Sequence, residues 1–264
     1  MTRTRPTLAG LTVLVPRARD QAGELSALLR SRGAEPLEVP AIEIRPVAST
    51  AELDQAVEDL AAGRFDWVVL TSVNGVAAVR DRAEAAGRGP GGLGPARVAA
   101  VGPATEAALR AWGVTPDLVP EVATTAALGH AFDAGSGRVL LARADLANPE
   151  LGTILRDKGW DPVEVVAYHT VPVSALDPAA RRRLDDGQVD WVAFTASSTV
   201  TGFLNSYGGP PPPGTRVAAI GPVTAATAGS AGIRVAATAS EHTIPGLVAA
   251  IERAVSPDSA GGVG

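Results

Sequence analysis

The chain repeats itself, and this repeat constrains the fold more than any other feature of the sequence. The segment VLVPRARDQAGELSALLRSRGAEPLEVP, starting at Val13, resembles VLLARADLANPELGTILRDKGWDPVEVV, starting at Val139. FDWVVLTSVN (65–74) likewise resembles VDWVAFTASS (189–198), and RVAAVGPATEAAL (97–109) resembles RVAAIGPVTAATA (216–228). The offset between matched residues shortens from 126 to 124 to 119, as changes in loop length after a duplication would produce. The repeat therefore predicts two similar structural units.

Short apolar runs alternate with amphipathic segments in both halves. Near-continuous apolar runs are typical of parallel strands buried on both faces, and segment 20–32 has the apolar spacing of a helix. The alternation predicts an α/β fold with parallel sheets and right-handed crossovers. The predicted strands are 12–16, 66–71, 97–101, 138–142, 190–195 and 216–220.

Two longer extended segments, 37–47 and 163–173, occupy matching positions in the halves. Both exceed the ordinary strand length of about 5–6 residues. A strand of that length could leave one sheet and enter the other. Such a bridge would make the first domain discontinuous, formed by the N-terminal strand and helix together with the C-terminal third of the chain.

Composition excludes several classes of site. The chain has no cysteine, so disulfides, zinc-thiolate sites and cysteine nucleophiles are ruled out. Its three histidines show no metal-ligand spacing, and a net charge of −5 with 4% aromatics argues against nucleic-acid binding. The N-terminus MTRTRPTLAG has no apolar signal region, and no run approaches the ~18 apolar residues of a membrane helix. We therefore expect a cytoplasmic protein with no membrane contact.

Two glycine turns each follow a predicted strand and precede a predicted helix. They are Gly102-Pro103-Ala104-Thr105 and Gly221-Pro222-Val223-Thr224. Proline suits the first helical position, and the free N–H groups with the helix dipole favour a carboxylate or phosphate. Strand-to-helix punctuation is the simpler interpretation, but ligands of α/β proteins bind at this edge. We predict ligand contacts at Gly102, Thr105, Gly221 and Thr224; neither turn matches a nucleotide-binding loop.

Hydroxyl and amide side chains follow two further strands. Helix capping is their first expected role, and it leaves other hydroxyls free to face a ligand. The candidates are Thr71, Ser72 and Asn74 in one half, Thr195, Ser197 and Ser198 in the other, and the matched pair Thr124 and Thr243.

Arg17 and Arg143 occupy the same place in the two repeats, just past the first strand. Arginine there could bind carboxylates in a bidentate manner, although a plain surface role fits each equally well. Tyr168 is one of only two tyrosines and lies in a predicted crossing strand; a half-buried strand aromatic is its structural alternative. His169 should point to the opposite face of that strand, so we do not expect it to act as a partner.

The motifs together, in order, resemble the uroporphyrinogen-III synthase family over about residues 10–253. No single motif is specific, but their collinear combination is. The set comprises Val15-Pro16-Arg17, Thr71-Ser72-Val73-Asn74, the turn from Ala100 to Thr105, Val166-Ala167-Tyr168, the turn from Thr195 to Val200, and the turn from Ala219 to Thr224.

This resemblance implies two flavodoxin-like parallel α/β domains joined by a two-stranded β-ladder, with the active site in the cleft between them. The implied domains are 1–38 plus 172–264 and 45–167, with connecting strands 39–46 and 166–173. The family needs no cofactor, and the sequence shows no cofactor or metal motif. Gly75 stands where the family often has alanine, and Ala196 where proline is frequent.

The implied reaction closes the linear tetrapyrrole hydroxymethylbilane into uroporphyrinogen III, with inversion of the last ring and loss of water. This is a lyase reaction of tetrapyrrole, porphyrin and haem biosynthesis. Tyr168 would hydrogen-bond, and assist the departure of, the substrate hydroxyl, because a phenol can donate without ionising at neutral pH. The other candidate residues would bind substrate. We expect a monomer, with possible hand-over of substrate from the preceding deaminase.

Two other functions remain compatible with the sequence. A two-lobed small-molecule binding protein would also show duplicated α/β lobes with crossing strands. A degenerate synthase copy kept as a regulatory partner is the second, although the departures at Gly75 and Ala196 are mild. The C-terminal segment SPDSAGGVG (256–264) is predicted to be disordered.

Overall fold

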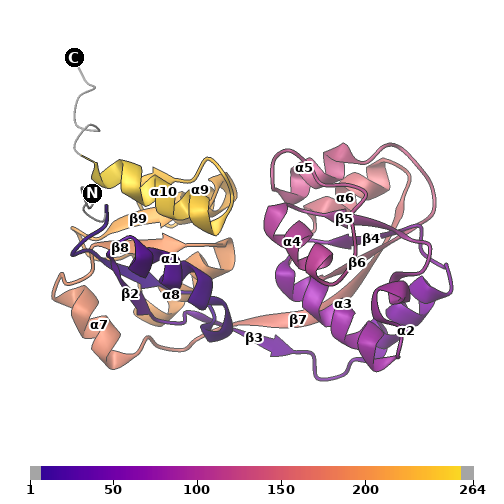
Figure 1. The fold of residues 1–264 in the computed structure, drawn as a ribbon, viewed down its shortest axis with the longest axis horizontal. Coiled ribbons are helices and arrows are strands. Elements are labelled where there is room, and N and C mark those ends of the chain that lie inside the picture. Colours follow the sequence, from indigo (N-terminus) through magenta and orange to yellow (C-terminus); the bar gives the residue numbers. More distant parts are fainter. Residues whose placement is uncertain (1–6, 257–264) are drawn as a thin grey trace, which may run out of the picture. The chain divides into compact units, whose positions relative to one another are not determined.

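The computed structural model of the chain describes residues 7–256 and contains two five-stranded sheets flanked by helices (Figure 1). The chain divides into two compact units. Unit 1 comprises the chain up to Glu43 together with the chain from Val171 onward, and unit 2 comprises Ile44–Thr170. Apart from Ser256, the C-terminal segment predicted to be disordered lies outside the described residues.

The sheet of unit 1 has the strand order β10-β9-β8-β1-β2, and its neighbouring strands are parallel. Read from the other edge and renumbered along the chain, this is the 2-1-3-4-5 order of flavodoxin-like folds. Its strands are β1 (Thr12–Val15), β2 (Glu35–Glu38), β8 (Trp191–Phe194), β9 (Arg216–Ala219) and β10 (Ala237–Thr238). Its helices are η1 (Arg19–Gln21), α1 (Gly23–Ser31), α7 (Pro178–Asp185), α8 (Ser197–Tyr207), α9 (Pro222–Ser230) and α10 (Ile244–Val255).

The second sheet has the order β3-β7-β6-β4-β5, and β7, β6, β4 and β5 are parallel. An isolated parallel bridge from Ala99 to Leu118 stands where the repeat places β10 in unit 1. Its strands are β3 (Ile42–Pro46), β4 (Trp67–Leu70), β5 (Arg97–Ala100), β6 (Arg138–Ala144) and β7 (Asp161–Pro172). The helices of unit 2 are α2 (Ala51–Ala61), α3 (Val73–Ala85), η2 (Gly89–Leu93), α4 (Pro103–Ala111), α5 (Thr125–Ala131) and α6 (Glu150–Asp157).

Each sheet is buried on both faces, which explains the near-continuous apolar runs of its central strands. In β8, Trp191 packs with α1 and α10, whereas Val192 packs with α7 and α8 on the opposite face. In β4, Val68 packs with α2, α3 and α4, and Val69 packs with α5 and α6. Successive residues of a strand thus pack into cores on opposite faces of the sheet, as the period-2 geometry of a strand requires.

All six strands predicted from the apolar runs are present with nearly the predicted bounds. The single extended segment predicted over 37–47 is wrong, because β2 ends at Glu38 and β3 begins only at Ile42. Pro40 lies in the break and has no N–H to donate to a ladder. The flanking amides of Val39 and Ala41 instead donate to Val15 O (3.1 Å) and Pro16 O (3.3 Å). Its counterpart β7 is continuous over 12 residues.

The carboxylates of the two Asp-Trp pairs hold strand beginnings together within each unit. Asp66 accepts a hydrogen bond from the Arg138 amide (2.9 Å), and Asp190 accepts one from the Thr12 amide (2.8 Å). Both residues precede the β-strand that carries the tryptophan of their pair. Both carboxylates therefore have structural partners, the backbone amides at the beginnings of neighbouring strands.

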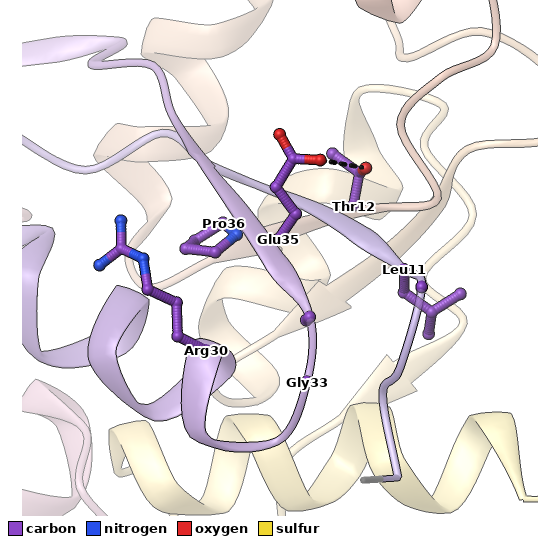
Figure 2. A pocket seen from close by; sticks show the side chains of 8 residues that line it. Leu11, Thr12, Arg30, Gly33, Glu35 and Pro36 are labelled. Carbon is purple, nitrogen blue, oxygen red and sulfur yellow. Dashed lines mark hydrogen bonds between the residues drawn. The ribbon is translucent and has the colours of Figure 1, made fainter.

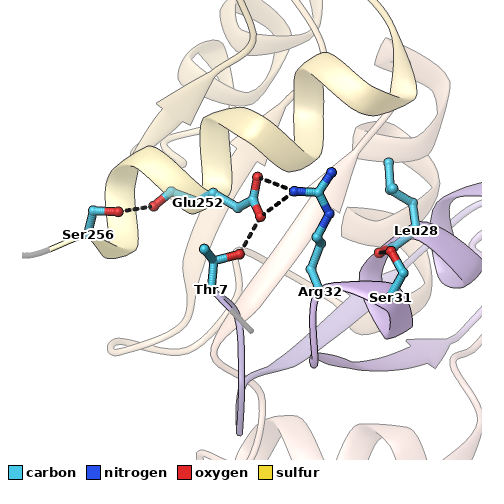
Figure 3. Close-up of polar contacts among 6 residues, drawn as sticks. All are labelled: Thr7, Leu28, Ser31, Arg32, Glu252 and Ser256. Atoms are coloured by element: carbon cyan, nitrogen blue, oxygen red, sulfur yellow. Dashed lines mark hydrogen bonds and ion pairs between the residues drawn. The ribbon is translucent and has the colours of Figure 1, made fainter. Parts of the chain in front are cut away.

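The N-terminal segment of unit 1 is fixed to the last helix by polar contacts (Figure 3). The carboxylate of Glu252 on α10 accepts hydrogen bonds from Arg32 Nη1, at 3.0 Å, and from the hydroxyl of Thr7. Arg32 follows the last residue of α1, so its ion pair also joins α1 to α10. The Arg32 side chain is 47% exposed and that of Glu252 is 15% exposed, so solvent partly screens the ion pair, which is worth at most about 1 kcal/mol.

Candidate active site

The loops after the carboxyl ends of the parallel strands carry most of the predicted site residues. We call residues 71–75, 101–105, 119–124 and 145–149 the unit 2 rim, and residues 16–19, 195–199, 220–224 and 239–243 the unit 1 rim. Ligands of open α/β sheets bind at this edge, where the strand order reverses. The reversal falls between β6 and β4 in unit 2 and between β1 and β8 in unit 1.

Ser72 begins α3 in the unit 2 rim. Its extended backbone (φ −161°, ψ 158°) lets Oγ accept the amide of Gly75 at 2.9 Å, so the predicted cap is confirmed. Gly75 itself cannot gain a side chain without cost, because a Cβ there would lie 2.9 Å from the Ala142 carbonyl of β6. The first turn of α3 therefore packs directly against β6, which fixes where Ser72 and Asn74 lie.

Tyr168 reaches this turn from β7. A bulge in the β6–β7 ladder pairs Arg143 with Val166 but Ala144 with Tyr168, so Ala167 is the extra residue. Both Ala167 and Tyr168 are consequently buried on the same core, although simple alternation would place them on opposite faces. The bulge directs the Tyr168 side chain toward α3.

The phenol of Tyr168 lies 2.9 Å from Ser72 Oγ, in a hydrogen bond that either hydroxyl could donate. Burial raises the pKa of Tyr168, hydrogen bonds from Ser72 and Asn74 partly offset the rise, and the charge of Asp145 adds to it. The phenol therefore stays protonated at neutral pH. Three predicted site residues from distant segments thus form one hydrogen-bonded group.

The glycines of the two turns are required by close packing, not by an unusual backbone conformation. Gly102 (φ 175°) and Gly221 (φ −176°) are both extended. A Cβ on Gly102 would meet Ala123 Cβ at 2.5 Å, and one on Gly221 would meet the ring of His242 at 2.9 Å. Ala123 and His242 precede Thr124 and Thr243, so each glycine lets the following rim loop pack onto the start of a helix.

Buried hydroxyls follow both glycines. Thr105 is 3% exposed and Thr224 is 5% exposed, and neither hydroxyl makes a hydrogen bond within residues 7–256. Both lie in the first turn of their helices, α4 and α9, where backbone N–H groups are also free. A carboxylate at either turn would satisfy these donors.

Thr124 and Thr243 cap the helices that follow. Thr124 Oγ1 accepts the Ala127 amide at 3.1 Å, and Thr243 Oγ1 accepts the Gly246 amide at 3.0 Å. Capping, which the sequence predicts as their first role, is confirmed for both. Thr71 and Thr195 lie half-buried at the ends of β4 and β8.

The unit 1 rim holds its hydroxyls differently. Ala196 occupies the N-cap position that Ser72 has in unit 2, and no serine side chain can cap there. Thr199 compensates: its Oγ1 accepts the Ala196 amide (3.3 Å) and donates to the Ala196 carbonyl (2.6 Å). Ser197 is 2.8 Å from Thr227 Oγ1, whereas half-buried Ser198 makes no hydrogen bond within the described residues.

The paired arginines have different surroundings. Arg143 is 5% exposed, donates to the Asn148 carbonyl at 2.8 Å and forms an ion pair with Glu164. Its guanidinium is therefore committed within the protein. Arg17 is half-buried and forms no ion pair or hydrogen bond within residues 7–256; burial lowers its pKa, while the charges of Glu24 and Asp20 act to raise it.

A model of the family described as "Uroporphyrinogen-III synthase HemD" matches residues 23–249 of the chain. The chain belongs to the uroporphyrinogen-III synthase family. The uroporphyrinogen-III synthase of Synechococcus elongatus is 33% identical over 256 residues, covering 93% of this chain and 96% of that protein. The porphyrin biosynthesis protein HemD of Ruminiclostridium josui is 31% identical over 75% of this chain, and the match spans 40% of that longer protein. The family comprises lyase-type enzymes of tetrapyrrole biosynthesis.

Solved structures of the uroporphyrinogen-III synthase family share the fold. A mutant of the Thermus thermophilus enzyme aligns with a TM-score of 0.67 at 23% identity, covering 93% of this chain and 98% of that one. The Helicobacter pylori protein aligns with a TM-score of 0.58 at 18% identity, covering 90% and 97%. The predicted fold, two parallel α/β units, is confirmed.

One pair of site-adjacent residues is not predicted from the sequence. Asp145 follows β6 in the unit 2 rim, and its Oδ2 lies 2.8 Å from His169 Nδ1. Because β7 bulges before Tyr168, strand alternation is a poor guide to what His169 contacts. The available signal was an acidic residue three positions after the end of the predicted strand 138–142, two residues beyond Arg143.

A hollow of about 470 Å³ in unit 1 lies away from these residues. It is bordered by Thr12 and Glu35, the first residues of β1 and β2, and hence lies at the edge opposite the rim (Figure 2). No predicted site residue lines it. Within residues 7–256 no His, Asp or Glu side chains gather as a metal ion would need, and no helix is long and apolar enough to cross a membrane.

Proposed function

We propose that this protein closes hydroxymethylbilane to uroporphyrinogen III, inverting the last ring and releasing water. Membership of the uroporphyrinogen-III synthase family supports the reaction. The observation that carries the assignment of the site is the hydrogen-bonded group of Tyr168, Ser72 and Asn74 in the unit 2 rim.

We assign to Tyr168 the donation of the proton that the departing substrate hydroxyl needs. Ser72 Oγ already accepts the Gly75 amide, so its own hydrogen can point to the phenol oxygen. The Asn74 side chain acts on the same phenol. With its oxygen accepting these hydrogen bonds, Tyr168 can direct its own O–H toward the substrate.

The first step breaks the C–O bond of the hydroxymethyl group, and the oxygen leaves as water after taking a proton. The electron pair of the ring nitrogen makes the first ring an azafulvene as its N–H proton is lost, which balances the proton given to the leaving oxygen and restores Tyr168. The substituted carbon of the last ring then attacks the azafulvene to give a spiro intermediate. Fragmentation and reclosure then yield the inverted ring. The uncatalysed bilane closes without inversion, so the enzyme has mainly to hold the bilane in the right conformation.

Carboxylate binding is assigned to the helix beginnings and Arg17. Gly102 with Thr105 and Gly221 with Thr224 present free N–H groups and buried hydroxyls. Such groups bind anions without supplying a strong acid or base. The remaining binding candidates are Thr71, Thr124, Arg143, Thr195, Ser197, Ser198 and Thr243; of these, Arg143 has the weakest support because it is already paired.

Exposed apolar side chains in the unit 2 rim suit the pyrrole rings. Val73, Val122 and Leu146 are 46%, 51% and 75% exposed, and all three lie within the residue ranges of this rim. Val166, opposite Arg143 in β7, is 38% exposed. Single exposed apolar residues are ordinary, but a group at one sheet edge marks a binding surface.

The test is an isomer assay. The purified protein receives hydroxymethylbilane made in situ by the preceding deaminase, and the oxidised products are separated chromatographically into type I and type III. Predominant type III supports the proposal. Type I alone, from protein with native circular dichroism, contradicts it and favours the two-lobed binding protein or a degenerate copy.

We further propose that the protein acts as a cytoplasmic monomer and takes its substrate from the deaminase, without nucleic acid, membrane or cofactor. The net charge of −5 argues against nucleic-acid binding. Sedimentation of the purified protein with and without deaminase tests the oligomeric state and the hand-over.

A further inference from the structure

Asp145 is bound to β7 by three separate hydrogen bonds. Its amide donates to the Tyr168 carbonyl (3.3 Å), its Oδ1 accepts the Thr170 amide (3.2 Å), and its Oδ2 pairs with His169 Nδ1 (2.8 Å). These contacts involve three consecutive residues of β7, and they begin at the tyrosine. Asp145 Oδ1 also accepts the amide of Leu146, which orients the carboxylate.

The contacts lie where the β6–β7 ladder is irregular. The bulge removes the regular pairing just before Tyr168, and β6 ends at Ala144, so no further strand residue of β6 can hold β7 there. Asp145 replaces the missing ladder with one backbone and two side-chain bonds. Without the two side-chain bonds, β7 beyond the bulge would be held on this side only by the backbone pairing at Tyr168.

We propose that Asp145 is a positioning residue for the reaction: it fixes β7 beyond the bulge and so holds the Tyr168 hydroxyl on Ser72. His169 assists by orienting the carboxylate. The proposal rests on the proposed function only in that Tyr168 is taken to act on the substrate; the positioning itself is a property of the structure.

The charges around Asp145 agree with this role. Burial acts to raise the pKa of Asp145, but the His169 side chain and the amides of Thr170 and Leu146 hold it below its usual value. The carboxylate is therefore ionised at neutral pH, and its oxygens accept the hydrogen bonds of the neighbouring amides. Its side chain is 30% exposed and that of His169 is 39% exposed, so the pair lies at the surface of the rim.

Three variants separate the hydrogen bonds of Asp145 from its charge. Asp145→Ala removes both side-chain bonds to β7. Asp145→Asn keeps Oδ1 as the acceptor for the Thr170 amide, but it removes the charge and replaces the Oδ2 acceptor beside His169 Nδ1 by an NH2 group. Asp161→Asn is the matched control, since Asp161 is an exposed carboxylate at the other end of the same strand.

Activity and amide hydrogen exchange are both measured. In Asp145→Ala we expect kcat to fall about 10- to 100-fold with KM within about twofold, because misplacing a reacting group by about 1 Å can cost 10²-fold. The Thr170 amide should exchange at least about 10-fold faster than in the wild type, while amides of β4 stay protected. Asp145→Asn should keep kcat within about threefold, and Asp161→Asn should match the wild type.

Two results would overturn the proposal. One is an Asp145→Ala variant whose Thr170 amide exchanges its hydrogen fast while its kcat is unchanged. The other is an Asp145→Asn variant that is as inactive as Asp145→Ala although the Thr170 amide still exchanges slowly, which would assign the effect to the charge or to the His169 contact and not to the hold on β7. If Asp145→Ala does not fold, Asp145→Ser replaces it, since one short hydroxyl cannot reach both donors.

A failure of the proposed function gives a different pattern. The wild-type protein would then form no type III product, while the exchange measurements would still report whether Asp145 holds β7. If the Thr170 amide of Asp145→Ala exchanges as slowly as in the wild type, the positioning role is wrong, whatever reaction the protein catalyses.

Discussion

The two rims come from one repeated sequence but are equipped differently. Unit 2 has a serine at the helix beginning after β4, where unit 1 has Ala196 after β8. It also has Tyr168 in β7, and the repeat offset of 126 places Ile42 at the corresponding position in unit 1. The same offset sets Asp145 and His169 against Arg19 and Glu43. The groups assigned to assist loss of the substrate hydroxyl, Tyr168 with Ser72, thus belong to unit 2 alone.

Duplication supplied two similar scaffolds, and what the units still share indicates what each rim must keep. Both retain the glycine packed under a loop and the buried threonine in the next helical turn. These features suit anion binding and serve equally well in either copy. The difference predicts that changes at the groups found in unit 2 alone alter the chemistry, whereas changes at positions that the two units share alter binding or stability.

The two tyrosines provide the sharpest test of this division. Tyr168→Phe removes the phenol from the unit 2 rim, and we expect kcat to fall about 10- to 100-fold, at the low end of the range for a lost general acid because the chemistry is intrinsically easy. Tyr207→Phe, in unit 1, loses only a hydrogen bond to Asp185 at 2.7 Å and should keep full activity. Type III formation is measured for both. Equal activities would remove the reason for placing the chemistry in unit 2.

Replacing Arg143 and replacing Arg17 by alanine should have different effects. Arg143→Ala leaves Glu164 without its buried partner and should lower the free energy of unfolding by about 2 kcal/mol; breaking a fully buried pair costs about 3–5 kcal/mol, but Glu164 is 38% exposed. Arg17→Ala breaks no ion pair within the described residues and should instead raise KM about 10-fold, the loss of one charge-assisted hydrogen bond. Urea denaturation and steady-state kinetics on both variants check this. A stable Arg143→Ala with raised KM would make the two arginines equivalent.

Gly102→Ala and Gly221→Ala compare the shared turns. Both backbones are extended, so alanine meets no conformational strain, and the cost depends on the neighbour. Ala123 Cβ, at 2.5 Å, can move only with its backbone, whereas the His242 ring, at 2.9 Å, can rotate away. We expect about 1–3 kcal/mol of destabilisation for Gly102→Ala and less than about 1 kcal/mol for Gly221→Ala. Thermal unfolding measures the difference, and the reverse order would contradict it.

The strands, helix beginnings and caps were predictable because each depends on a local pattern. Buried parallel strands need continuous apolar runs, and a threonine such as Thr124 before a helix caps it whatever lies further away. The state of Arg143 was not predictable, since it depends on Glu164, which lies on a neighbouring strand. Tyr168 reaches Ser72 through a bulge, and a one-residue insertion in a ladder leaves no sign in hydropathy. Asp145 escaped prediction for the same reason.

The smallest expected effect concerns the helix beginning that the two rims no longer share. Ala196→Ser gives α8 an acceptor for the amide of Thr199, whose side chain already accepts the Ala196 amide, and so completes a reciprocal capping box. We expect a gain of about 0.5–1 kcal/mol in unfolding free energy with unchanged kcat. Ser72→Ala should cost a similar free energy but also lower kcat, because the same oxygen that caps α3 holds Tyr168. If Ser72→Ala lost stability and kept kcat, its serine would be a cap and nothing more, and the two helix beginnings would be functionally alike.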